Sequence, residues 1–292
     1  MNLGLLPDIV TAAIVLSGTY VLIALAWVVV FYAAHLVNFA TGEMLVIGGF
    51  GVATVMTEGL PYSVAVLVSL LFVALIGAGI YGGFLRPLAG HTLLTPVIVT
   101  FGAAVVLQGL VLLIWGSSPR FIDAPGSDLV FSLPGGITLT ALGLVIPVVA
   151  LLVYLGALLV TNGTSVGLRM RAAHESALLA SQRGIHIYTI FAIAFTLATV
   201  LAGLAGILHM QRSVVSWSII PMGIKGLVPA LIGGLDSIKG VLPGALIVGF
   251  AESLAVLSFG ARFSDLTVFT LLLLVLLVRP SGLFGTAHAQ RV

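Results

Sequence analysis

The most regular feature of the sequence is a series of long apolar runs separated by short polar segments. A helix that spans a bilayer needs about 20 mostly apolar residues. The runs are continuous rather than alternating, so they predict helices and not the strands of a membrane barrel. The predicted fold is all-α, a polytopic membrane bundle of eight or nine transmembrane helices in one domain over residues 1–292. The runs lie at 9–30, 36–56, 62–80, 94–115, 137–160, 188–210, 219–235, 241–257 and 264–278.

The last three runs are shorter, and glycine and proline interrupt them. Broken apolar segments of this kind span half of a bilayer or line a cavity, so one of these three is expected to be re-entrant or half-spanning. At the start of the chain, residues 1–8 contain no Lys or Arg, and the run that follows is too long for a signal peptide. Residues 9–30 are therefore predicted to be a retained first helix.

Composition agrees with a membrane protein and excludes several function classes. Charged residues make up 7% of the 292, against about 25% in soluble domains. A soluble enzyme and a nucleic-acid partner are therefore excluded. The absence of cysteine excludes thiol chemistry, and the histidines lack metal-site spacing, so no metal is expected. The sequence contains no phosphate-binding loop and no hydrolase motif. No cofactor is expected in this chain, and any ATP and magnesium must be bound by another subunit.

The longest polar stretch is 161–187, and its placement sets the orientation. If this loop is cytoplasmic, seven basic residues lie inside and four lie outside or within the membrane, a modest positive-inside bias. The inner seven are Arg86, Arg169, Arg171, Arg183, Lys239, Arg279 and Arg291, and the other four are Arg120, Arg212, Lys225 and Arg262.

Within this loop, residues 168–183 are rich in helix formers and contain no proline, so one helix is predicted. Thr164 and Ser165 are suited to cap its start, and Gly184 is suited to end it. A short amphipathic helix of this kind can lie on the bilayer or fit a groove on a cytoplasmic partner. The residue pattern leaves both alternatives open.

Four stretches resemble one family. The loop resembles the coupling loop of ABC-importer permeases, with matching residues Ala173, Glu175, Ala180 and Gly184, and Arg171 just before them. The segment 38–43, Asn-Phe-Ala-Thr-Gly-Glu, resembles a family Asn-Phe-Ala-His-Gly-Glu motif. Residues 225–240 resemble the family's Gly-Gly-x-Gly-Ser-x-x-Gly turn and are followed by Gly-Phe-Ala-Glu at 249–252. The end, 278–285, resembles its Arg-Pro-(Thr/Ser)-Gly ending. Together these identify the chain as a member of the branched-chain amino acid permeases of the LivH type.

The resemblance implies a permease domain in the bacterial inner membrane, an importer of branched-chain or related neutral amino acids. It implies four kinds of partner: two ABC ATPase subunits, a second related permease subunit (a heterodimer rather than a homodimer), an extracytoplasmic substrate-binding protein, and membrane lipid. Two alternatives remain at this point. One is a permease of the same architecture for urea or short-chain amides, which Thr41 leaves open because it stands close to the expected path where the family has His. Asp236, which stands where the family has Gly, is the other departure and does not affect the family assignment. The other alternative is an ion-coupled secondary transporter, which would show paired intramembrane charges.

Polar residues within the spans are candidates for the translocation path or for structural hydrogen bonds. A structural role is favoured for Glu43, which can pair with Lys225 or satisfy backbone groups, although it can also contact a substrate ammonium. Lys225 is expected to reach the outer interface, and Glu252 to lie late in its span, so that Glu43 is almost alone as a deeply buried charge. Gln108 is expected to link helices, and Trp27, Trp115 and Trp217 to form an interfacial belt. The full set of path or structural candidates is Asn38, Thr41, Gly42, Glu43, Gln108, Lys225 and Glu252.

Overall fold

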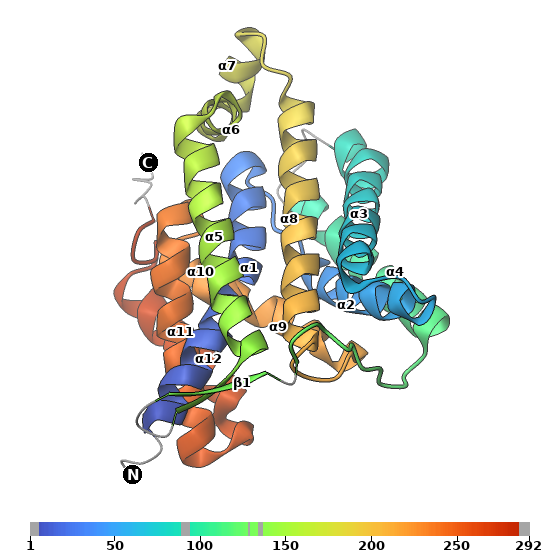
Figure 1. The fold of residues 1–292 in the computed structure, drawn as a ribbon. Coiled ribbons are helices and arrows are strands. Elements are labelled where there is room, and N and C mark those ends of the chain that lie inside the picture. The colour runs from blue at the N-terminus through green and yellow to red at the C-terminus, as the bar shows by residue number, and fades with distance from the viewer. Residues whose placement is uncertain (1–5, 89–93, 128, 134–136, 286–292) are drawn as a thin grey trace.

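The computed structural model describes residues 6–88, 94–127, 129–133 and 137–285, and within them the chain is a bundle of helices (Figure 1). The longer helices are α1 (Leu6–Ala34), α3 (Tyr62–Ile80), α4 (Leu94–Trp115), α5 (Ala141–Gly163), α8 (Ile187–Met210), α11 (Ile238–Phe259) and α12 (Ser264–Val278). The shorter ones are α2 (Thr41–Thr57), α6 (Ser165–Glu175), α7 (Ala177–Gln182), α9 (Ile220–Lys225) and α10 (Leu227–Gly233), and a hairpin pairs β1 (Val130–Leu133) with β2 (Ile137–Thr140).

Seven helical segments of the described chain are long and apolar enough to cross a membrane. Two further apolar segments, Thr41–Thr57 and Trp217–Gly233, are shorter. These nine segments coincide with the nine apolar runs, which confirms the predicted helical membrane bundle. The expected interruption lies in the seventh run, where the chain forms the two short helices α9 and α10 instead of one span.

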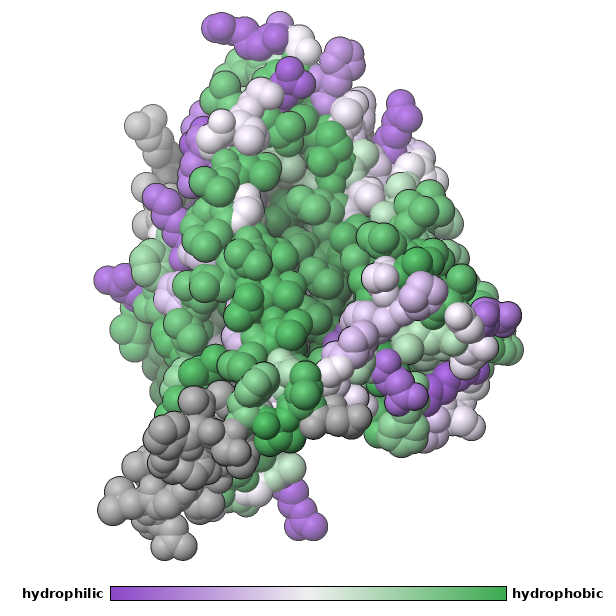
Figure 2. All heavy atoms as spheres, viewed as in Figure 1, coloured by the Kyte–Doolittle hydropathy of each residue, from purple (hydrophilic) through white to green (hydrophobic). Residues whose placement is uncertain are grey.

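Helix α1 is the centre of the bundle. Every residue from Tyr20 to Val30 is buried, and the helix packs against α5, α8, α10 and α11. A helix that is apolar all round is stable where protein or lipid surrounds it, and α1 is surrounded mostly by protein. By contrast, α4 and α12 lie at the periphery and expose most of their leucine, valine and phenylalanine side chains. Figure 2 shows a broad apolar surface across the middle of one face, with hydrophilic residues gathered at the end that carries α6 and α7.

Helices α2 and α8 approach so closely that their backbones touch at glycines. A Cβ on Gly206 would overlap the carbonyl oxygen of Leu45, and one on Gly48 would overlap that of Gly203. Small residues at such positions let apolar helices associate in a bilayer, where burial from water no longer drives packing. This contact holds α2 in place against the long helix α8.

Several predicted boundaries change for local reasons. Helix α2 begins at Thr41 rather than 36, because Asn38 forms a turn before it. Helix α5 begins at Ala141 rather than 137, because the hairpin precedes it and the Thr140 side chain caps the helix by accepting a bond from the Gly143 N–H at 3.2 Å. Of the basic residues used for orientation, Arg291 lies outside the described residues.

The loop at 161–187 forms two helices, so the prediction of one helix over 168–183 is wrong. Helix α6 ends at Glu175, and Ser176, with an extended backbone, starts α7 by accepting a hydrogen bond from the Leu179 N–H. Serine favours such a cap over a helix interior, because its hydroxyl satisfies a free N–H of the next helix. The other two predictions are confirmed: Thr164 caps α6, and Gly184 has the left-handed φ of 80°.

We expect Gly206→Ala to lower the stability of the chain by about 1–3 kcal/mol, because the added methyl forces α2 and α8 apart. Thermal unfolding in detergent measures this change. Gly156→Ala is the matched control: it lies on α5, and its added methyl meets open space. Equal melting temperatures for the two variants would contradict the tight α2–α8 contact.

Candidate functional site

The motif at 38–43 forms a buried turn at the start of α2. The Asn38 side-chain oxygen accepts a hydrogen bond from the Ala40 N–H at 3.1 Å, and the Thr41 hydroxyl donates to the Asn38 carbonyl at 2.7 Å. The Thr100 hydroxyl donates to the Val37 carbonyl at 3.2 Å and so ties α4 to the same turn. Asn38 and Thr41 therefore act here in structural hydrogen bonds that satisfy a buried turn.

This turn packs directly on the interrupted helix α9. A Cβ on Gly42 would overlap the carbonyl oxygen of Ile220, and one on Gly223 would overlap the backbone of Gly42. The Trp27 indole N–H donates to the Gly223 carbonyl at 2.9 Å. The expectation that Trp27 belongs to an interfacial belt is therefore wrong: it lies in the core, where it satisfies a backbone group of the broken segment.

Glu43 follows in the first turn of α2 and is buried. No described group of the protein donates a hydrogen bond to its Oε2. A carboxylate in the first turn interacts favourably with the helix N-terminus, which offsets part of the cost of burial. Of the alternatives open for Glu43, pairing with Lys225 is not the one found, because Lys225 pairs with Glu252 and Asp265.

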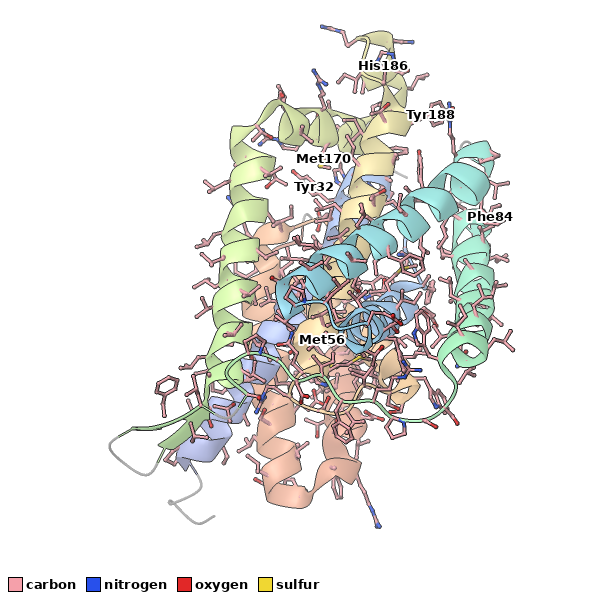
Figure 3. The ribbon with its side chains drawn as sticks, turned by 45° about the vertical axis from the view of Figure 1, so that its right-hand side comes forward. Tyr32, Met56, Phe84, Met170, His186 and Tyr188 are labelled. Carbon is pink, nitrogen blue, oxygen red and sulfur yellow. The ribbon has the colours of Figure 1, made fainter. Side chains whose placement is uncertain are left out.

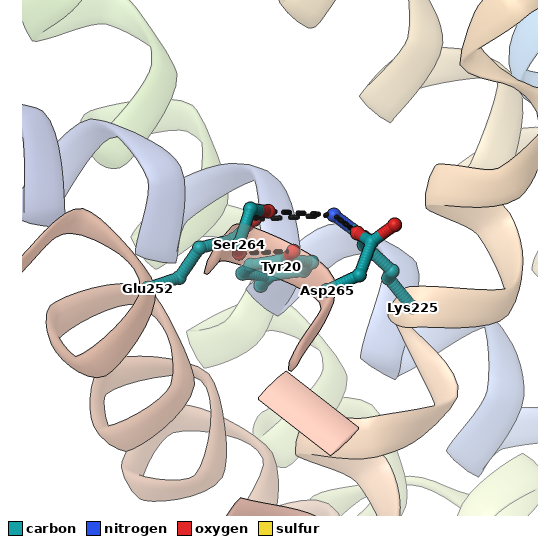
Figure 4. A network of polar contacts seen from close by, with 5 residues as sticks. All are labelled: Tyr20, Lys225, Glu252, Ser264 and Asp265. Carbon is teal, nitrogen blue, oxygen red and sulfur yellow. Dashed lines mark hydrogen bonds and ion pairs between the residues drawn. The ribbon is translucent and has the colours of Figure 1, made fainter. Parts of the chain in front are cut away.

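Lys225 lies at the end of α9 in a polar network (Figure 4). Its Nζ is 3.3 Å from Glu252 Oε1, donates to the Ser264 hydroxyl at 2.8 Å and pairs with Asp265. The Ser264 hydroxyl donates to Glu252 Oε1, and the Tyr20 hydroxyl donates to Glu252 Oε2 at 2.5 Å. The network thus joins α1, α9, α11 and α12 through one buried carboxylate.

The network revises two expectations. Lys225 is not a lone lysine that reaches the outer interface, since its side chain is only 18% exposed and pairs with Glu252. Glu252 is itself buried, so Glu43 is not almost alone as a buried charge. Tyr20, Ser264 and Asp265 were missed as site residues because they lie far from Glu252 or Lys225 in sequence.

A cavity of about 380 Å³ opens on the other side of Glu252. Apolar side chains from α1, α5 and α11 line most of it, and His209, Arg212 and Ser213 add polar groups at the end of α8. Partial burial lowers the pKa of the Arg212 guanidinium, which stays cationic at neutral pH because the ordinary value is so high. The cavity therefore has a carboxylate on one wall and a guanidinium on another.

Gln108 does not join these residues. Its side chain is partly exposed on α4 and makes no hydrogen bond to any described residue, so a link between helices through Gln108 stays a prediction.

The proposed coupling residues lie on α6 and α7, which project from one end of the bundle (Figure 1). Ala173 and Ala180 are buried, while Arg171 is partly exposed and Glu175 and Gly184 are exposed. Leu178 and Leu179 on α7 are 69% and 62% exposed. The small residues therefore hold the loop against the bundle, and its outer face presents one carboxylate beside two leucines.

The sequence matches one family model, described as "Branched-chain amino acid transport system / permease component", over residues 9–278. The chain belongs to this permease family. It is a transport permease subunit of the ABC importer type and a multi-pass protein of the inner membrane.

Named relatives of this permease align over nearly its whole length. The branched-chain amino acid transport permease BraD of Pseudomonas aeruginosa is 32% identical, and the alignment covers 94% of each chain. LivH of Escherichia coli is 30% identical over 96% of this permease and 95% of LivH. Among solved structures, PsaBC from Streptococcus pneumoniae in complex with Fab has a similar fold, with a TM-score of 0.52, 16% identity and coverage of 94% of this permease and 92% of that chain.

We expect Lys225→Met to destabilise the chain by about 3–5 kcal/mol, because it leaves the buried Glu252 carboxylate without its cation. Adding Glu252→Gln to Lys225→Met should recover part of that loss, since the uncompensated charge is then gone. Asp265→Asn is the matched control and should cost less than about 1 kcal/mol, because the Asp265 side chain is 71% exposed. Unfolding in detergent measures all three. A double variant no more stable than Lys225→Met would contradict the pairing.

Proposed function

We propose that this chain carries branched-chain or related neutral amino acids across the inner membrane, driven by ATP hydrolysis in partner subunits. The relatives BraD and LivH, which are named for branched-chain amino acid transport, support this substrate class. The chain itself needs no cofactor in this proposal, because the ATPase subunits bind ATP and magnesium. The complete importer comprises this chain, a second related permease subunit, two ATPases and an extracytoplasmic binding protein that delivers the substrate.

The observation that carries the proposal is the exposed face of the loop helices. Glu175, Leu178 and Leu179 are exposed on α6 and α7, the two helices at the hydrophilic end of the bundle (Figure 2). Exposed leucines beside a carboxylate favour docking into a groove on a protein partner. We infer that α6 and α7 dock on an ATPase, with Glu175 at the contact.

Two alternatives differ in their support. A permease for urea or short-chain amides shares the architecture, and uptake assays with the cognate binding protein discriminate the cargo: leucine, isoleucine and valine should compete, and urea and acetamide should not. An ion-coupled transporter predicts paired charges among the helices, and Lys225 and Glu252 do pair. The paired charges that this alternative requires are therefore present, and family membership is what favours the importer.

We expect Glu175→Arg to reduce substrate uptake about tenfold or more while the chain remains folded, because a reversed charge at the docking face opposes the ATPase surface. The measurement is uptake and ATP hydrolysis in vesicles that contain the complete importer. Glu58→Arg is the control, since Glu58 is an exposed carboxylate at the end of α2. Fully coupled uptake by an assembled Glu175→Arg complex would contradict the docking role.

Among the polar candidates in the spans, we propose a path role for Glu43 alone. Asn38 and Thr41 already serve the turn and Glu252 serves the network, whereas Glu43 Oε2 receives no hydrogen bond from a described group. A carboxylate at this position is suited to contact the ammonium group of a passing amino acid. The contacts around Glu43 therefore favour a transport role over a structural one for this residue.

We expect Glu43→Gln to lower uptake about tenfold or more, because the amide keeps the shape of the side chain but loses a charge-assisted contact with the substrate. Thr41→Ser is the control, since it keeps the hydroxyl that closes the turn. Assembly with the ATPases and thermal stability should be unchanged in both variants. Uptake by Glu43→Gln at the level of the unmodified chain would assign Glu43 to structure.

A further inference from the structure

Four aromatic rings meet where α6 crosses the end of α1, and we call them the ring column: Phe31, Tyr32, His35 and His174. The His174 ring stacks on His35 with centroids 4.2 Å apart and on Tyr32 at 5.3 Å. His35 in turn meets Phe31 edge-on at 5.4 Å. Figure 3 labels Tyr32 at the end of α1 and Met170 on α6 in this region. One side chain from the loop is therefore stacked on two at the end of α1 and just after it, and Phe31 supports one of these two.

The backbone of His35 is strained. Its φ of 51° is the only positive value at a non-glycine residue in the described chain. A bulky residue in this left-handed region costs of the order of 1 kcal/mol and persists where the surroundings hold it. Helices that end in this conformation mostly use glycine or asparagine there. The His174 stack gives a physical reason for a ring at this position.

Stacking, rather than a hydrogen bond at Nδ1, orients the His174 ring. Its Nδ1 is buried and bonds to no described group. The neighbours of His174 on α6 are also fixed, since Met170 and Ala173 are buried. A displacement of α6 therefore acts on the end of α1 through side chains that are in direct contact.

A cavity of about 380 Å³ borders the ring column and gives it room to move. Phe31, His35 and His174 form one side. The other side comes from Leu231 on α10, from Leu235 and Asp236 just after it, and from Pro280 and Ser281 after α12. Packed interiors change between discrete arrangements rather than deform continuously, so a void beside a strained residue allows a second arrangement of the rings.

We propose that His174 is a positioning residue for transport: its ring contact with Tyr32 and His35 passes movement of the loop helices to α1. The proposal rests on the proposed docking of α6 and α7 on an ATPase. Helix α1 is suited to receive such movement because it packs against α5, α8, α10 and α11. Without the ring contact, the ATPases hydrolyse ATP but move less substrate for each ATP.

The test is the number of ATP molecules hydrolysed per substrate imported, measured in vesicles that contain the complete importer. We expect His174→Ala to raise this ratio about fivefold or more, the lower range of coupling between distant sites. His174→Phe, which restores a ring, should return the ratio to within about twofold of the unmodified value. His186→Ala is the matched control, since His186 is an exposed histidine of the same loop and should leave the ratio unchanged.

The ratio separates the ring contact from the docking itself. Coupled transport by an assembled His174→Ala complex overturns the proposal, as does a His174→Phe variant as uncoupled as His174→Ala. If His174→Ala fails to bind the ATPases, His35→Asn carries the test from the α1 side, because asparagine tolerates the left-handed backbone but lacks the ring. A normal ratio in His35→Asn then overturns the proposal. If the Glu175→Arg importer stays coupled, the docking proposal is wrong. If only the ring variants stay coupled, the docking proposal stands and the proposal for the ring column is wrong.

Discussion

A helix that is interrupted inside a bilayer must have its freed backbone groups satisfied by protein, because lipid offers no hydrogen bonds. The segment Trp217–Gly233 depends on this constraint. The Trp27 indole bonds to the Gly223 carbonyl, and Lys225 at the end of α9 is neutralised by the buried Glu252 carboxylate. The start of α2 also packs on α9, through Gly42. The position of the family motif therefore follows from how α1 and α11 stabilise the broken segment.

The features that could be predicted from sequence are those with a local cause. Continuous apolar runs give the helices, because their length and composition alone decide whether they span a bilayer. Glycine and proline in the last third give the interruption. Thr164 and Gly184 bracket the loop helices, since capping depends on a few neighbouring residues. The residues of the motif at 38–43 were likewise recognised together, and the structure keeps them together in one turn.

Other features could not be predicted because their partners are distant in the chain. Tyr20 and Glu252 are separated by 232 positions, and nothing near either residue indicates the other. The sequence likewise does not indicate whether Lys225 pairs with Glu43 or with Glu252, because the packing of α9 decides which carboxylate is near. Tryptophan is a residue typical of interfacial anchors. Because other helices surround α1, however, the Trp27 indole lies in the core and donates to a backbone carbonyl.

Three aromatic side chains of α1 connect the two ends of this arrangement. Tyr20 bonds to Glu252, Trp27 bonds to the broken helix, and Tyr32 stacks on His174 in the loop. Over the 12 positions from Tyr20 to Tyr32, an α-helix rises about 18 Å. Because a helix of this length is stiff along its axis, a shift imposed at Tyr32 changes the contacts of Trp27 and Tyr20 as well. The polar network around Glu252 is thus joined to the loop helices through the length of α1.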